Sequence, residues 1–93
     1  MIKILHLPLK REWYEMIERG EKTEEYREVK PYWLKRVLPI GTFDELRICF
    51  SYGYTKRIMI FNVTDYRVDF GKPEWGAPKD RAVFVFNLGK RIS

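Results

Sequence analysis

Apolar and polar residues alternate along most of this chain, and such alternation predicts β-strands rather than helices. Successive side chains of a strand point to opposite faces, so a half-buried strand repeats every second residue. The pattern predicts strands over residues 2–7, 45–52, 57–70 and 81–88, with a short extended segment over 22–27. Apolar residues occupy both faces of the first and last runs. We therefore expect both to be largely covered on two sides, and the last to be a central strand.

Single residues refine this prediction. We expect Pro8 to end the first strand, and we interpret His6 as a packed strand residue, since a lone histidine is a weak sign of metal or acid–base chemistry. Cys49 is expected to be a small buried residue. Within 57–70 the apolar phase slips by one residue near Thr64-Asp65, which predicts a β-bulge that bends the strand.

Two segments have helical periodicity instead. Residues 10–19 carry an apolar stripe at i, i+3 and i+4 that is expected to face the core and consists of Trp13, Met16 and Ile17. Gly20 follows at the position where a helix often ends with a left-handed residue. Residues 31–37 begin with proline, which suits a first helical turn, and they predict a second short helix.

The order of these elements defines the expected fold. Strand, helix, short strand, short helix and three or four further strands form one domain over residues 1–93. This order predicts an α+β fold that is mainly β: a small, strongly bent sheet or barrel with two short peripheral helices.

Composition narrows the class of protein. No apolar run approaches the roughly 20 residues that a membrane-spanning helix needs, and the first residues do not resemble a signal peptide. A single cysteine makes neither a disulfide framework nor a thiolate metal site. We therefore expect a cytoplasmic protein with no membrane partner, no metal and no cofactor, and the oligomeric state is left open.

Charge is spread unevenly along the chain. Residues 12–28 hold seven acidic and three basic side chains, a charge of −4, so the other residues carry +9 of the net charge of +5. A basic surface around an acidic segment favours a polyanionic partner such as nucleic acid. The alternative is that these charges serve only solubility.

The densest polar stretch is Gly20-Glu21-Lys22-Thr23-Glu24-Glu25-Tyr26-Arg27. It forms either a prearranged polar site or a charged turn without a function. Strict alternation places Lys22 on one face of the extended segment, and Glu25 and Arg27 on the other. Lys22 and Glu25 therefore meet only if the chain turns or bulges between them.

This stretch resembles the G-x-K-x-x-E-x-R signature of the ASCH domain (activating signal cointegrator homology), in the PUA-like superfamily. Other parts of the chain resemble small single-domain members from bacteria and phages, namely residues 7–10, 13–17, 53–56, 75–78 and 88–90. The resemblance implies a PUA-like β-barrel and a cleft lined by the signature. Superfamily members mostly bind RNA or modified nucleotides. Some ASCH proteins are reported to remove the acetyl group of N4-acetylcytidine or to cleave RNA.

The signature matches the amidohydrolase group only in part. Lys22 stands at the position of its lysine, but Glu25 stands where that group has a threonine, and Glu74 is the only acid we would test as its distant glutamate. Lys22 is thus the candidate catalytic residue only if the protein is an enzyme. Because Glu25 favours a protonated Lys22, the local charges suit holding a ligand better than nucleophilic attack.

The leading hypothesis is therefore an RNA- or nucleotide-binding domain. Lys22 and Arg27 suit a phosphate or base acceptor, Glu25 suits an exocyclic amine, and Tyr54 or Trp75 suits stacking on an unpaired base. Trp75 lies in a Gly/Pro-rich loop, where it either caps the core or faces a ligand. The alternatives are a small hydrolase, a protein-interaction module, or an ion-pair network that only holds the helix against the sheet.

Overall fold

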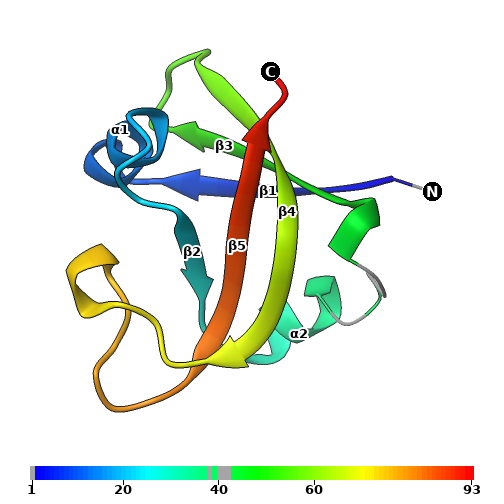
Figure 1. Cartoon of the computed structure of the whole chain (residues 1–93), viewed down its shortest axis with the longest axis vertical. Helices are drawn as coiled ribbons and strands as arrows, with labels where there is room; N and C mark the ends of the chain where they lie inside the picture. Colours follow the sequence, from blue (N-terminus) through cyan, green and yellow to red (C-terminus); the bar gives the residue numbers. More distant parts are fainter. Residues whose placement is uncertain (1, 38, 40–42) are drawn as a thin grey trace.

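The computed structural model describes residues 2–37, 39 and 43–93 of the chain. Within these residues, two helices and five strands follow one another along the chain (Figure 1). In chain order they are β1 (Lys3–Leu9), α1 (Arg11–Glu18), β2 (Glu24–Arg27), α2 (Pro31–Val37), β3 (Leu46–Tyr52), β4 (Ile58–Asp69) and β5 (Val83–Arg91), with 3-10 turns η2 (Phe43–Glu45) and η3 (Pro73–Trp75).

All five strands belong to one sheet, in the order β1-β3-β4-β5-β2. β1 runs parallel to β3, and every other neighbouring pair is antiparallel. The sheet curls into a half-barrel, so that β1 and β3 cross β4 and β5 at a steep angle (Figure 1). This confirms the predicted α+β fold, mainly β, with a strongly bent sheet and two short helices at its periphery.

The core fills the concave side of the curled sheet. Its fully buried side chains come from several strands and include Leu7, Leu46, Ile48, Phe50, Met59 and Phe86. From α1 the buried residues are Tyr14 and Ile17, whereas Trp13 and Met16 are half-exposed. The predicted stripe was therefore wrong in part, because Tyr14 stands three residues before Ile17 and packs its ring against Tyr52, with centroids 4.6 Å apart.

β1 departs from the prediction in two ways. It continues through Pro8, and His6 is exposed. Both differences have the same cause: β1 is an edge strand that pairs only with β3. An edge strand tolerates a proline because the missing N–H can point away from the ladder. Only one face of β1 is covered, through Leu5 and Leu7.

The other strand predictions hold. The register of β4 against β5 shifts around Val63 and Asp65, which confirms the bulge expected there. β5 lies between β4 and β2, and its residues 83–86 are all buried, as expected for a central strand. Cys49 is buried.

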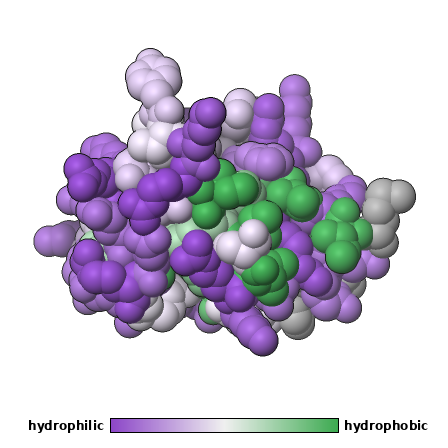
Figure 2. All heavy atoms as spheres, turned by 90° about the horizontal axis from the view of Figure 1, so that it is seen from above, coloured by the Kyte–Doolittle hydropathy of each residue, from purple (hydrophilic) through white to green (hydrophobic). Residues whose placement is uncertain are grey.

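The outer surface is mainly polar. Figure 2 shows one group of apolar side chains within a largely hydrophilic face. Several large apolar residues are about half exposed, among them Ile2, Ile4, Ile58 and Ile92. None of the described helices is long and apolar enough to cross a membrane.

Candidate functional site

A tight turn after α1 brings Lys22 into the molecule. Gly20 adopts a φ of 80°, the left-handed conformation predicted for it. Its N–H donates to the carbonyl of Ile17 at 3.0 Å, and the N–H of Glu21 donates to the carbonyl of Met16 at 2.9 Å. These two bonds form a Schellman motif, which reverses the chain before β2 begins at Glu24. The turn itself lies before Lys22, and β2 begins only at Glu24. Lys22 therefore stands outside the strand and its alternation, which lets its side chain meet that of Glu25.

Glu25 bridges the two cations of the signature. Lys22 Nζ lies 2.7 Å from Glu25 Oε1, and Arg27 Nη2 lies 2.7 Å from Glu25 Oε2. Lys22 also donates to the backbone carbonyl of Glu24, and Arg27 Nη2 donates to the carbonyl of Pro8 at 3.1 Å. The three signature side chains therefore come together and join β2 to the end of β1.

Lys22 is the buried member of this group, with only 1% of its surface exposed. Its ammonium lies 5.2 Å from the centroid of the Tyr26 ring and 6.0 Å from that of Trp13. Burial lowers the pKa of Lys22, and the neighbouring Glu25 carboxylate opposes that shift. Of these two opposing effects on the Lys22 pKa, burial is the larger. The ion pair with Glu25 that the local charges favour is present, at 2.7 Å.

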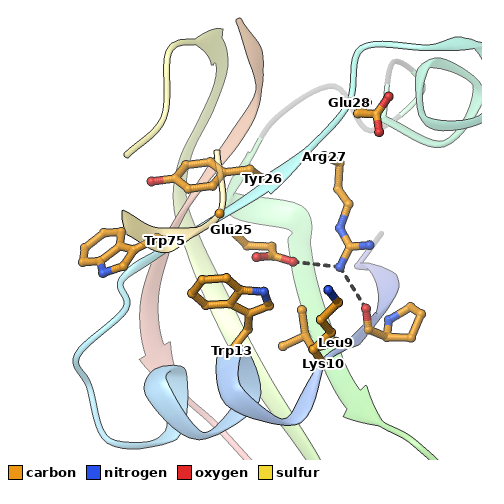
Figure 3. Close-up of a pocket in the computed structure, with 10 residues that line it drawn as sticks. Leu9, Lys10, Trp13, Glu25, Tyr26, Arg27, Glu28 and Trp75 are labelled. Carbon is orange, nitrogen blue, oxygen red and sulfur yellow. Dashed lines mark hydrogen bonds and ion pairs between the residues drawn. The ribbon is translucent and has the colours of Figure 1, made fainter. Parts of the chain in front are cut away.

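A cleft of about 430 Å³ opens above this ion-pair group (Figure 3). In the close-up, the indoles of Trp13 and Trp75 lie to one side of Glu25, and the guanidinium of Arg27 lies to the other. Lys22 does not line the cleft but lies beneath it. The residues that do are Pro8, Leu9, Lys10, Trp13, Glu25, Tyr26, Arg27, Glu28, Trp75 and Gly76.

The two predicted stacking residues have different positions. Trp75 is half-exposed and is one of the residues that line the cleft, and it does not belong to the buried core cluster. Lys72 Nζ lies 4.3 Å from the centroid of that ring. Tyr54 is fully exposed in the β3–β4 hairpin and does not line the cleft.

Trp13 is the cleft residue that the sequence pattern assigned to the core. Its ring packs against Gly76, where a Cβ would lie 3.2 Å from Trp13 Cζ2. Gly76 also has a φ of 96°, a conformation that other residues rarely adopt. Both the close ring and this backbone conformation therefore favour glycine here. The close approach holds the turn η3 against α1 and places both indoles on the same cleft.

Tyr26 fixes the opposite end of the loop that carries Trp75. Its hydroxyl donates to Glu24 Oε1 at 2.6 Å and accepts from the N–H of Lys72 at 3.0 Å. Gly71 lies directly on the ring, since a Cβ there would be 2.6 Å from Tyr26 Cε1. The loop is thus attached to β2 at its start and to α1 through Gly76.

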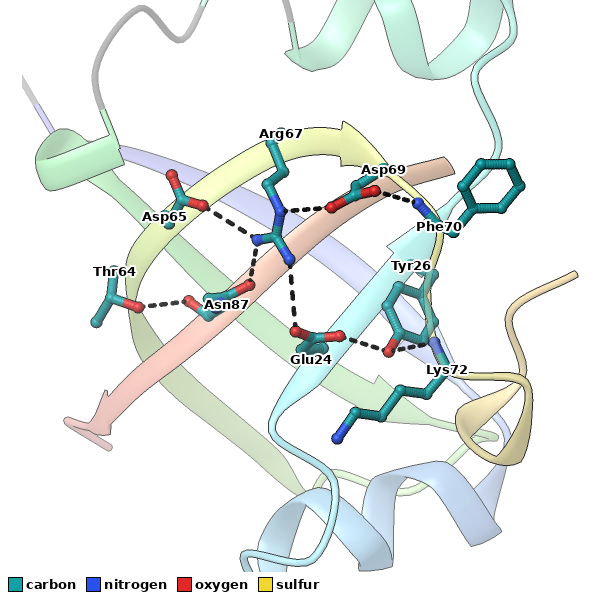
Figure 4. A network of polar contacts seen from close by, with 9 residues as sticks. All are labelled: Glu24, Tyr26, Thr64, Asp65, Arg67, Asp69, Phe70, Lys72 and Asn87. Atoms are coloured by element: carbon teal, nitrogen blue, oxygen red, sulfur yellow. Dashed lines mark hydrogen bonds and ion pairs between the residues drawn. The ribbon is translucent and has the colours of Figure 1, made fainter. Parts of the chain in front are cut away.

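A polar network on the convex face of the sheet supports β2 from behind (Figure 4). Its centre is the guanidinium of Arg67. The guanidinium forms ion pairs with the carboxylates of Asp65 at 3.1 Å, Asp69 at 3.2 Å and Glu24 at 3.7 Å. It also donates a hydrogen bond to the side-chain oxygen of Asn87 at 2.8 Å. Glu24 therefore connects Arg67 to the Tyr26 hydroxyl, and through it to the loop that carries Trp75.

Tyr26 is expected to make stability fall at alkaline pH. Burial and the hydrogen bond to Glu24 raise the pKa of Tyr26 well above its usual 10.0. Above that pH the unfolded chain loses the phenol proton while the folded chain keeps it, so the free energy of unfolding decreases as pH rises. Tyr26→Phe should therefore show a shallower decrease from about pH 9 to about pH 11.5.

Urea unfolding of both proteins over this pH range checks the prediction. The lowered pKa of Lys22 makes the free energy of unfolding rise with pH below its usual 10.5, which is opposite to the effect of Tyr26. Both proteins contain Lys22, so the difference between their two pH profiles reports Tyr26. Parallel profiles would show that the Tyr26 proton is not linked to folding.

Comparison with protein families, with curated protein sequences and with solved structures found no match to this chain. The likeness to ASCH domains therefore rests on the signature and the order of elements alone, and it stays a prediction. Among the described residues, no group of three or more His, Cys, Asp or Glu side chains lies close enough together to hold a metal ion.

Proposed function

We propose that this protein is an ASCH-type domain that binds single-stranded RNA or a nucleotide in the cleft above Glu25. One observation carries the proposal: two indoles, Trp13 and Trp75, line the same cleft as a paired carboxylate and guanidinium, Glu25 and Arg27. Aromatic rings offer stacking surfaces to an unpaired base, whereas fixed polar groups beside them read its edge.

Glu25 and Arg27 have the chemistry to read a base edge. A carboxylate has about four acceptor positions, and Glu25 uses two of them on its neighbouring cations. It can therefore accept a further bond from an exocyclic amine, as acids do with cytosine N4. Arg27 has five N–H donors, of which Nη2 serves Glu25 and Pro8.

Lys22 acts through Glu25 in this proposal. Because its ammonium is buried and bonded to Glu25 and to the Glu24 carbonyl, it holds the carboxylate in place and does not touch the ligand. This revises the role expected from the sequence, which assigned Lys22 to a phosphate or base acceptor. The positive charge outside residues 12–28 adds a salt-dependent attraction to the RNA backbone.

A titration of fluorescein-labelled single-stranded RNA tests the proposal. Binding is expected at low salt and should weaken steadily as salt is raised. Arg27→Ala should reduce affinity roughly tenfold or more, since it removes charge-assisted hydrogen bonds. Arg19→Ala is the matched control, because Arg19 is exposed and lines no part of the cleft. No binding at low salt, or equal affinities for Arg27→Ala and Arg19→Ala, would disprove the proposal.

A hydrolase acting on a modified nucleoside is the second candidate. The observation in its favour is the lowered pKa of Lys22, which increases the neutral, nucleophilic form. Against it, Lys22 lies beneath the cleft and is paired with Glu25. Incubation with N4-acetylcytidine separates the two candidates: release of acetate that Lys22→Ala abolishes supports the hydrolase, and no release counts against it.

A further inference from the structure

A second cleft, of about 520 Å³, adjoins the first one. The two share Tyr26, Arg27, Glu28 and Gly76 as lining residues, so they meet along one wall. The second cleft adds its own side chains from three parts of the chain, among them Lys30, Trp33 and Arg81. The two clefts therefore lie side by side along these shared residues.

The two clefts differ in charge. The first is lined by two cations, Lys10 and Arg27, and two carboxylates, Glu25 and Glu28, which balance. The second is lined by three cations and the single carboxylate of Glu28, so its net charge is +2; the cations are Arg27, Lys30 and Arg81. A balanced cleft suits an uncharged base, whereas a net positive cleft suits a phosphate.

Arg27 belongs to both clefts. Its Nη2 contacts Glu25 in the first, and its Cζ lies 5.1 Å from the centroid of the Trp33 ring, which lines the second. The guanidinium is thus held between a carboxylate and an indole at the boundary. A planar group with several donors at such a point can serve a base on one side and a phosphate on the other.

Arg81 and Lys30 are positioned to complete a phosphate site. Both side chains are exposed at the second cleft. Arg81 forms an ion pair with Asp80 at 3.2 Å, in which both side chains are more than half exposed. Exposed pairs of this kind contribute little, so Arg81 can exchange Asp80 for a phosphate oxygen without a large penalty.

We propose that the second cleft binds the phosphate group attached to the nucleoside that occupies the first cleft. This inference rests on the proposed function and makes it more specific. The ligand is then a nucleotide unit read in two parts: its base by Trp13, Trp75 and Glu25, and its phosphate by Arg27, Lys30 and Arg81. A free nucleoside fills only the first part.

Calorimetric titrations test this division. The four ribonucleosides are measured separately, and the tightest is compared with its own 3′- and 5′-monophosphates and with its dinucleoside monophosphate. At least one phosphate-bearing form should bind roughly tenfold more tightly than the nucleoside at low salt. In the double variant Lys30→Gln/Arg81→Gln most of this gain should be lost, because two of the three phosphate-binding cations are gone. Affinity for the nucleoside should stay that of the unmodified protein.

The variant Lys56→Gln/Lys90→Gln is the matched control. It removes the same charge from two exposed lysines that line neither cleft, so the gain should remain. The inference is overturned if phosphate gives no gain, if the gain survives in Lys30→Gln/Arg81→Gln, or if the control loses it equally. In each of these cases the proposed function is retained as long as a nucleoside binds. If no nucleoside, nucleotide or single-stranded RNA binds, the proposed function and the phosphate site are both disproved.

Discussion

Replacing Glu25 with alanine is expected to lower the free energy of unfolding by about 3–5 kcal/mol, a large part of what keeps a domain of this size folded. Glu25 is the only carboxylate in the described ion pairs of Lys22, at 2.7 Å, and Lys22 is 1% exposed. Without it, an ammonium is buried with no opposite charge beside it. Arg27 loses its bond to Oε2 as well.

Urea unfolding measures this loss, and Glu74→Ala serves as its control. Glu74 is exposed in η3, so its removal should change the free energy of unfolding by no more than about 0.5 kcal/mol. If Glu25→Ala unfolds at the same urea concentration as the unmodified protein, the ion pair does not hold the site together.

A double variant separates the structural role of the pair from its role in binding. In Lys22→Met/Glu25→Leu an apolar pair of similar size replaces the buried charges, a change that often leaves stability equal or higher. We expect stability to return towards that of the unmodified protein and RNA binding to be lost, because the carboxylate that reads the base is absent. Retained binding would show that Lys22 and Glu25 only attach α1 to the sheet.

The second large effect is expected at Trp75. Trp75→Ala should weaken binding of single-stranded RNA by about 1–3 kcal/mol, which is roughly 5- to 150-fold in affinity. The ring is half-exposed on the cleft and carries Lys72 at 4.3 Å. Because the side chain lies outside the core, its removal should change folding stability little. The same fluorescence titration measures affinity, and urea unfolding measures stability.

Tyr54→Ala is the control for Trp75→Ala. Tyr54 is an exposed aromatic residue in the β3–β4 hairpin and lines neither of the two clefts. Its replacement should leave affinity unchanged. If Tyr54→Ala weakens binding and Trp75→Ala does not, the RNA lies on the hairpin rather than in the cleft.

The sequence predicted the elements well because their periodicity is strong. Every predicted strand and helix is present, and the phase slip near Thr64-Asp65 located the bulge. The errors arose where the neighbours of a residue decide its position. The apolar alternation around His6 suggests two covered faces, but the edge position of β1 leaves one face open. Periodicity alone does not show which strand lies at an edge.

The site could be predicted only in part, for a similar reason. The signature identified Glu25 and Arg27, and the glycine signal at position 20 located the turn that brings Lys22 to them. The other walls of the clefts come from distant segments. Trp13 has the spacing of a core residue, and only its contact with Gly76, sixty-three positions along the chain, places it at the cleft.

The most direct test of a base-binding cleft follows the indole N–H signals in a proton–nitrogen NMR spectrum as single-stranded RNA is added. The chain has three tryptophans, and single Trp→Phe variants assign their signals. We expect the signals of Trp13 and Trp75 to shift progressively, while the backbone signals of Gly53 and Tyr54 stay in place. RNA binding that leaves the Trp13 and Trp75 signals unchanged would contradict a base-binding cleft between them.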